Sequence, residues 1–131
     1  VHGEGGLDEL ATSGMANVAT LEDGKVKTFE VTPEDAGLPR CDIAEIKGGD
    51  AEFNAAALTA LLAGKPSAYR DTVLFTSAAA LIVAGKADNL KDGAAVAAES
   101  LDTGKARAAL DRMIEISHEV IVEEEDEAGN E

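Results

Sequence analysis

Aromatic residues make up only 3% of this 131-residue chain, and tryptophan is absent. Because large rings are scarce, the core must be built from Ala, Leu, Val and Ile, which favours closely packed helices. Cys41 is the only cysteine, so no disulfide can form within the chain, and this fits a reducing cytoplasm. No apolar run reaches the roughly 18 residues of a membrane-spanning helix, and no secretory leader opens the sequence. We therefore expect a cytoplasmic protein with no membrane partner.

Basic residues are scarce as well. The chain has 11 Lys and Arg against 26 Asp and Glu, which gives a net charge of -15. Nucleic acid is excluded as an expected partner, because its phosphates require clustered positive charge. A bare phosphate site would need Mg²⁺ or donors from elsewhere. The acidic surplus also supports an alternative function, a non-catalytic acidic binding module whose capture of a partner would weaken with salt.

The richest chemistry lies in residues 1–9, VHGEGGLDE, where an apolar strand end runs into a glycine-rich turn. Asp8 and Glu9 follow the turn directly and can present oxygens to a hard cation. Mg²⁺ is commonly held by one or two carboxylates together with water and substrate phosphates. The pattern predicts a magnesium–phosphate site at the end of a strand. The alternative is a solvated helix start, where acidic residues favour the positive end of the helix dipole.

His2 and Gly3 are the candidate substrate-binding residues of the same segment. His2 either lines the ligand pocket from the strand end or is a structural histidine satisfied by backbone groups. Gly3, with Gly5 and Gly6, either lets the backbone approach a phosphate or simply forms a sharp bend. No residue of the chain is predicted to be catalytic in the strict sense.

The remaining sequence predicts one β-hairpin followed by helices. Residues 14–32 contain two alternating runs joined by Asp23-Gly24, a good hairpin turn signal. The mixed polarity of both faces indicates an edge ribbon. Four helices are expected. The first begins after Asp50 as its cap and ends near Gly64, and the second runs from Tyr69 to Ala84. The third runs from Asn89 to about Leu101 with Asp88 as its cap, and the fourth from Thr103 or Gly104 to about Ile116.

We divide the chain into an α/β unit, residues 1–118, and an acidic tail, residues 119–131. Like charges in the tail repel one another, so we expect it to be disordered. Residues 117–122 either end the fourth helix or add a short strand.

Five segments, taken in order, resemble the anthranilate phosphoribosyltransferase family. Residues 1–9 are similar to the family's V-H-G-x-x-G-L-D-E, and residues 33–38 to its P-E-D-x-G-L. Residues 48–55 resemble G-G-D-A-x-x-N-A, and residues 78–87 resemble A-A-A-L-Y-V-A-G-K-A. Residues 101–106 resemble the closing D-S-G-K-A element. Thr76-Ser77 departs from the family, which commonly has Asn-Ala there, and this puts a local packing contact in doubt.

The resemblance implies an α/β fold, namely the C-terminal part of the large phosphoribosyltransferase domain. A β-hairpin and about four helices would pack on a parallel sheet that receives Val1 and is completed by missing upstream strands. The family's glycine-rich phosphate loop and its K-H-G-N segment do not appear here. We therefore expect a fragment or truncated chain with little or no activity alone. The intact enzyme is expected to be a homodimer through a small domain that is largely absent here.

The resemblance also implies a function for the intact enzyme in tryptophan biosynthesis. The family transfers phosphoribose from phosphoribosyl pyrophosphate (PRPP) to anthranilate and releases pyrophosphate. Asp8 and Glu9 match the carboxylates that hold the PRPP-bound Mg²⁺ in the family. A pyrimidine-nucleoside phosphorylase, which resembles the same fold but uses phosphate as nucleophile, is the enzymatic alternative.

Overall fold

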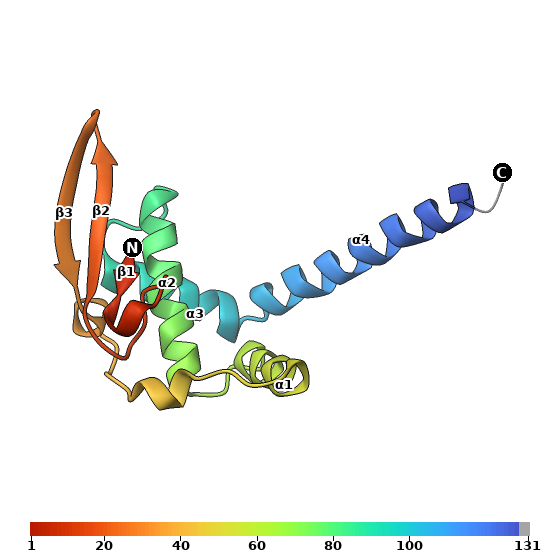
Figure 1. The fold of residues 1–131 in the computed structure, drawn as a ribbon, viewed down its shortest axis with the longest axis horizontal. Helices are drawn as coiled ribbons and strands as arrows, with labels where there is room; N and C mark the ends of the chain where they lie inside the picture. Colours follow the sequence, from red (N-terminus) through yellow and green to blue (C-terminus); the bar gives the residue numbers. More distant parts are fainter. Residues whose placement is uncertain (129–131) are drawn as a thin grey trace.

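The architecture is an antiparallel sheet packed against a helical layer (Figure 1). A computed structural model describes the backbone of residues 1–128 and the side chains of residues 1–118. The strands of the described chain are β1 (His2–Gly3), β2 (Ala16–Glu22) and β3 (Lys25–Val31), and its α-helices are α1 (Ala51–Leu62), α2 (Ala68–Val83), α3 (Leu90–Asp102) and α4 (Lys105–Ala128). Short 3₁₀ turns occupy Glu4–Gly6, Pro33–Ala36 and Ile43–Ile46. The predicted α/β class, with one hairpin and four helices, is confirmed.

β2 and β3 form the predicted hairpin. Their register runs from Ala16 opposite Val31 to Glu22 opposite Lys25. Asp23 and Gly24 at the turn have φ values of 49° and 74°. Two consecutive positive φ angles match the right-handed twist of the flanking strands, which is why Asp-Gly suits this position. All of β3 except Val31 is exposed, so this strand is the expected edge.

The sheet order is β1-β2-β3, and both pairings are antiparallel. From the sequence we expect the first strand to enter a parallel sheet supplied by upstream strands. In the structure β1 pairs antiparallel with β2, with His2 opposite Asn17 and Gly3 opposite Ala16. The chain turns back after Gly3, and β2, which begins at Ala16, becomes the antiparallel partner. The upstream strands expected to complete the sheet stay a prediction.

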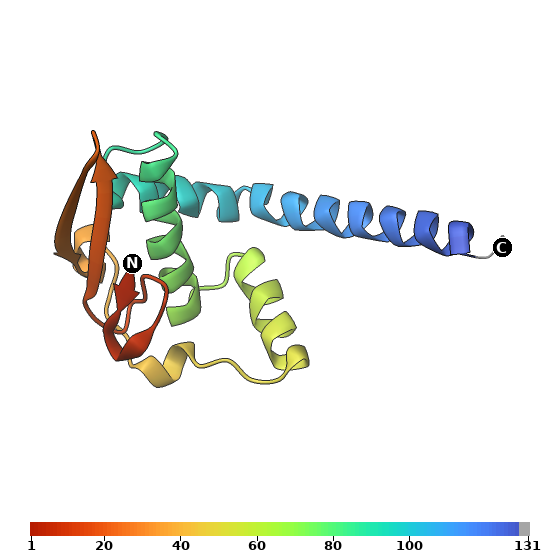
Figure 2. The ribbon, with the colours of Figure 1, turned by 45° about the horizontal axis from the view of Figure 1, so that its top comes forward.

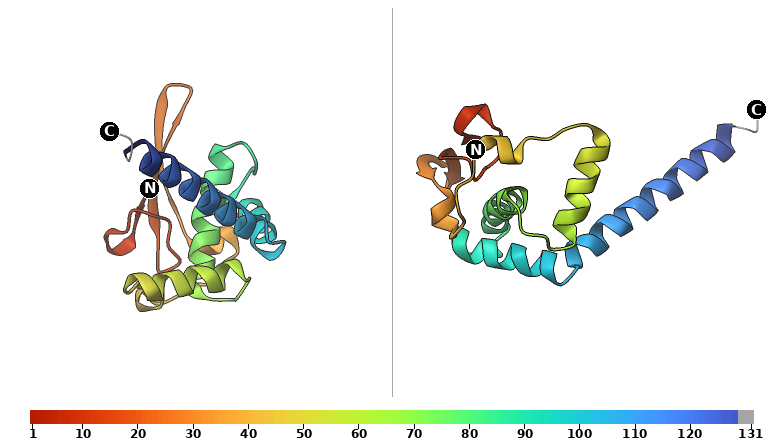
Figure 3. Two further views of the ribbon diagram at one scale, coloured as in Figure 1. Left: turned by 90° about the vertical axis from the view of Figure 1, so that its right-hand side faces the viewer. Right: turned by 90° about the horizontal axis from the view of Figure 1, so that it is seen from below.

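α2 lies in the middle of the helical layer, with the hairpin on one side and α1 and α3 on others (Figure 3). It contributes Phe75 and Ala78 to a core that also contains Leu10, Ala16 and Val31. On another face its Leu74 joins a second core cluster with Leu61, Ala97 and Leu101. The nearly continuous apolar sequence of this helix is therefore explained by burial on two sides.

α2 and α3 cross at very short distance. A β-carbon added to Gly93 would lie 2.8 Å from both the Cα and the carbonyl oxygen of Ala78. Glycine inside a helix costs about 1 kcal/mol in helix propensity relative to alanine. Here the absence of a side chain at Gly93 permits the backbones of α2 and α3 to approach closely, so the role of Gly93 is in helix packing.

The helix ends follow the predicted capping chemistry with one correction. The Asp50 side chain accepts a hydrogen bond from the Phe53 amide, as expected for a cap. The cap of α3 is Asn89, whose side chain accepts from the Asp92 amide, and not Asp88. Both residue types cap helices well, so the sequence could not rank two adjacent candidates.

α4 leaves the domain as a single helix (Figure 2). It begins at Lys105, just after the predicted start at Thr103 or Gly104, and continues to Ala128, beyond the predicted end near Ile116. The backbone of residues 119–128 is thus helical where we expect a disordered tail, because Glu and Ala extend an existing helix at little cost. Residues 129–131 lie outside the described residues, and the division of the chain at residue 118 stays a prediction. No helix in the described part of the chain has the length and apolarity needed to cross a bilayer.

Candidate carboxylate site

The segment after β1 is a tight loop that folds back on the strand. The Gly3 amide donates to the Leu7 carbonyl oxygen at 2.7 Å, and the Glu4 amide donates to the Met15 carbonyl oxygen at 2.9 Å. Gly5 and Gly6 have φ values of 79° and 86°. These left-handed conformations are costly for residues with a β-carbon, so the glycines make the reversal possible.

Gly3 is required for the close approach of the loop to the strand. A β-carbon at this position would lie 2.7 Å from the Glu9 carbonyl oxygen and 3.2 Å from the Leu7 β-carbon. Gly3 itself is buried. Its most direct role is therefore to let the backbone that carries the carboxylates lie against β1.

Asp8 and Glu9 are exposed and lie in a bend rather than in a helix. The interpretation of the pair as a helix start is thus wrong. Asp8 raises the pKa of Glu9 above its usual value, first through a hydrogen bond between the side chains and second through charge repulsion. The two adjacent carboxyl groups therefore interact, and a divalent cation bound to both would relieve their repulsion.

The donor set fits magnesium better than a metal that requires a full protein cage. Among the described side chains, no group of three or more His, Cys, Asp or Glu residues is placed to hold a metal ion. A pair of carboxylates with open surroundings leaves most coordination positions to water and phosphate oxygens, which Mg²⁺ accepts readily. Asp8 and Glu9 would be the protein ligands of such an ion.

His2 is exposed and lies on β1 beside an open groove of about 630 Å³. Residues of all three strands line this groove, including Asn17 and Phe29. Its position is compatible with a ligand contact. The roles of His2 and Gly3 toward substrate stay predictions.

The other end of the carboxylate loop is anchored to α2. Thr76 Oγ1 donates to the Leu10 carbonyl oxygen at 2.8 Å. Thr12 Oγ1 lies 2.8 Å from Thr72 Oγ1, and the Thr12 amide donates to the same Thr72 oxygen at 3.3 Å. The sequence analysis did not predict these contacts, although two threonines one turn apart in an apolar helix were a visible signal.

Cys41 belongs to this anchor. Its amide donates to the Thr12 carbonyl oxygen at 3.0 Å, and its sulfur lies 3.3 Å from Thr12 Oγ1. Both contacts give the cysteine a structural role.

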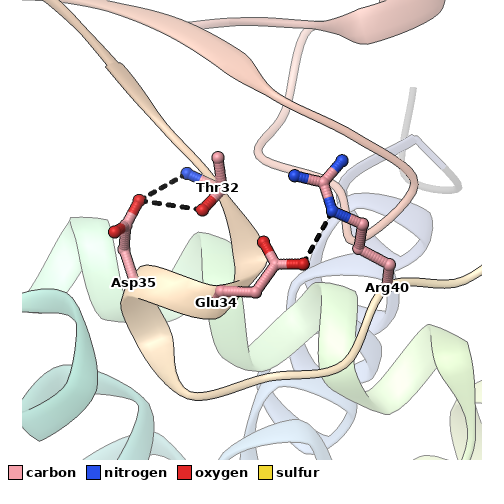
Figure 4. A network of polar contacts seen from close by, with 4 residues as sticks. All are labelled: Thr32, Glu34, Asp35 and Arg40. Carbon is pink, nitrogen blue, oxygen red and sulfur yellow. Dashed lines mark hydrogen bonds and ion pairs between the residues drawn. The ribbon is translucent and has the colours of Figure 1, made fainter.

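The second family-like motif, residues 33–38, forms a structural turn (Figure 4). Asp35 accepts from the Thr32 amide at 2.7 Å and from the Thr32 hydroxyl at 3.0 Å. Arg40 Nε donates to Glu34 Oε1 at 2.7 Å, and this contact lowers the pKa of Glu34. Both carboxylates of the motif are thus engaged by flanking residues at the protein surface, Asp35 by Thr32 and Glu34 by Arg40.

The third motif, residues 48–55, is structural as well. Asn54 accepts from the Gly49 amide at 2.9 Å and donates to the Gly49 carbonyl oxygen at 3.0 Å. Together with the Asp50 cap, these contacts fix the start of α1. The carboxylates of the first motif are exposed and adjacent, whereas Glu34 of the second motif is paired with Arg40 and Asp50 of the third caps α1.

Comparison with known proteins agrees with this arrangement. Residues 1–107 match the family described as the a/b domain of the glycosyl transferase family. The chain belongs to this family. It is 58% identical over 118 residues to the anthranilate phosphoribosyltransferase of Rhodopseudomonas palustris, and 56% identical over 119 residues to that of Brucella ovis. The first alignment covers 90% of this chain and 35% of the relative, and the second covers 91% and 35%.

Solved structures of anthranilate phosphoribosyltransferases also resemble this chain. The anthranilate phosphoribosyltransferase of Thermus thermophilus matches with a TM-score of 0.73 at 38% identity, over 85% of this chain and 32% of that one. The Saccharomyces cerevisiae enzyme in complex with PRPP and Mg matches with a TM-score of 0.79 at 27% identity, over 87% and 33%. The resemblance to the anthranilate phosphoribosyltransferases is confirmed, and the chain spans about a third of the length of the relatives it matches.

Proposed function

We propose that this chain forms part of an anthranilate phosphoribosyltransferase, in which it contributes the metal-binding carboxylates. The observation that carries the proposal is the exposed Asp8–Glu9 pair on a glycine loop, in a chain 58% identical to such an enzyme. PRPP, anthranilate and Mg²⁺ are the proposed substrates and cofactor. A relative in complex with PRPP and Mg, and one in complex with 4-fluoroanthranilate, support this set.

The proposed reaction replaces one bond at the anomeric carbon of PRPP. The bond from that carbon to pyrophosphate breaks, a bond to the anthranilate nitrogen forms, and the nitrogen loses a proton. Positive charge develops on the sugar and negative charge on the leaving pyrophosphate. A bound magnesium ion supplies neutralisation and orientation of the leaving group. Asp8 and Glu9 hold that ion, and the loop from Gly3 to Glu9 sets their position.

The chain is not expected to perform this reaction alone. The family's phosphate loop and K-H-G-N segment are not found in its sequence. We therefore expect catalysis only when residues 1–118 are joined to the rest of the domain. Assembly of that enzyme as a homodimer is a further expectation.

The test is a chimera in which this chain replaces the matching segment of the Rhodopseudomonas palustris relative. We expect the chimera to consume anthranilate in the presence of PRPP and Mg²⁺, which fluorescence follows directly. Parallel incubation with a pyrimidine nucleoside and phosphate tests the phosphorylase alternative. A correctly folded chimera with no anthranilate-dependent turnover would contradict the proposal.

A further inference from the structure

Two threonines on one face of α2 hold the segment that follows the carboxylates. Thr72 and Thr76 are four residues apart and therefore project from the same side of the helix. Thr76 Oγ1 donates to the Leu10 carbonyl oxygen at 2.8 Å. Thr72 Oγ1 lies 2.8 Å from Thr12 Oγ1 and accepts from the Thr12 amide at 3.3 Å. The helix thus holds two alternate residues, Leu10 and Thr12, of the segment that follows the carboxylates.

The gripped segment is buried and has little freedom. Leu10 is 1% exposed and Thr12 is 0% exposed. Glu9 directly precedes Leu10, and on the other side of the pair Leu7 accepts the hydrogen bond from Gly3. The carboxylate-bearing residues therefore lie between two fixed backbone points, one on β1 and one on α2.

The hydrogen bond made by the Thr76 hydroxyl is unusual for a threonine inside a helix. Such hydroxyls commonly donate to the carbonyl four residues earlier in the same helix. Thr59 and Thr103 do so, donating to Ala55 and Glu99 at 2.8 Å and 2.7 Å. The Thr76 hydroxyl donates instead to a residue 66 positions away in sequence.

We propose that Thr76, supported by Thr72, is a positioning residue for the metal site at Asp8 and Glu9. The hydrogen bond from Thr76 fixes the carbonyl of the residue next to Glu9 and so fixes where the two carboxylates converge. This inference rests on the proposed metal-binding function of the pair. It gives α2 a role in positioning the metal ligands, which neither the composition of the chain nor its sequence motifs indicate.

The experiment is a site-resolved Mn²⁺ titration of the complete 131-residue chain by NMR, with paramagnetic broadening of backbone amides as the readout. Mn²⁺ replaces Mg²⁺ because both prefer oxygen ligands. The variant Thr76→Val removes the hydroxyl and keeps the shape, and Thr76→Ser restores the donor. Thr59→Val is the matched control, because its hydroxyl bonds only within its own helix. Acidic residues 123–127 provide a second metal-attracting region as an internal reference.

We expect Thr76→Val to require about fivefold more Mn²⁺ for half-maximal broadening at residues 7–10, the effect of one lost hydrogen bond. The midpoint of Thr76→Ser should lie within about twofold of the parent value. The midpoint of Thr59→Val, and the broadening of the acidic reference region, should equal those of the parent. An unchanged midpoint in Thr76→Val, or an equal change in Thr59→Val, would overturn the inference.

The paired variant Asp8→Asn with Glu9→Gln separates this inference from the function on which it rests. If the paired variant leaves the broadening at residues 7–10 unchanged, the proposed metal site itself fails. If it abolishes the broadening while Thr76→Val has no effect, the metal site stands and the positioning role fails. Amide exchange at Leu10 and Ala11 provides an independent readout and should accelerate in Thr76→Val.

Discussion

The carbonyl oxygen of Glu9 lies so close to Gly3 that a β-carbon at residue 3 would sit 2.7 Å from it. The backbone of Gly3, with φ of -81° and ψ of 157°, is accessible to any residue, so the constraint is purely steric. The first strand and the carboxylate pair are therefore coupled through a single close contact.

Gly3→Ala is expected to displace the carboxylates. The added methyl group must push the Glu9 backbone away, which should lower the free energy of unfolding by about 1–3 kcal/mol and weaken Mn²⁺ binding at residues 7–10. Gly24→Ala is the control: its φ of 74° strains any side chain, the added carbon meets no neighbouring atom within 4 Å, and the residue lies in the hairpin turn rather than in the carboxylate loop. Urea unfolding and the Mn²⁺ titration measure both effects. Equal loss of metal binding in the two variants would contradict the steric account.

Gly93→Ala should destabilise the chain although alanine is the better helix former. The methyl group would collide with the Ala78 backbone at 2.8 Å, and overpacking of this kind costs about 1–3 kcal/mol. Ala95→Gly, at an exposed position of the same helix, should lose about 1 kcal/mol from propensity alone. Chemical denaturation compares the two. A stabilised Gly93→Ala variant would show that α2 and α3 are not in close contact.

On acidification, metal binding at the carboxylate pair should weaken at a higher pH than it would if Glu9 had the usual pKa of a glutamate. Asp8 raises the pKa of Glu9, so Glu9 takes up its proton at a higher pH and then competes with the cation. For the same reason, protonated Glu9 in the metal-free protein contributes to the free energy of unfolding. This contribution to stability is lost as the pH rises through the raised pKa of Glu9. Carbon-detected NMR of the Glu9 carboxyl group measures the titration. Asp8→Asn should return it to the usual range, and an unchanged midpoint would contradict the coupling.

Loss of the α1 cap should reduce stability without touching the metal site. Asp50→Ala leaves the Phe53 amide without its acceptor, at a cost of about 1 kcal/mol. Asp50→Asn keeps a side-chain oxygen and should remain near the parent. Thermal unfolding measures the difference. A change in Mn²⁺ broadening at residues 7–10 in Asp50→Ala would show that Asp50 also contributes to the metal site.

Local rules of sequence predicted much of this fold. The Asp23-Gly24 turn was predictable because few residues adopt its two positive φ angles, and the Asp50 cap because few side chains can accept a hydrogen bond from a free helix amide. The exposed carboxylates were predictable because glycines and acidic residues are adjacent in sequence. The ligands of a site are easiest to predict when they are contiguous.

Contacts between distant segments were not predictable in the same way. The bond from Thr76 to Leu10 joins residues 66 positions apart, and no local pattern specifies its partner. The direction of β1 depended on which strand the returning chain could reach. The length of α4 beyond Ile116 depended on helix propagation competing with charge repulsion in the acidic segment.

The most direct test of the central claim is the Mg²⁺ dependence of anthranilate turnover in the chimera and in its Asp8→Asn, Glu9→Gln counterpart. Metal stabilisation of a developing charge is worth several kcal/mol, so the paired variant should lose about a hundredfold or more of Mg²⁺-dependent turnover while it remains folded. Full turnover with unchanged Mg²⁺ dependence in the paired variant would contradict the assignment of these carboxylates to the metal.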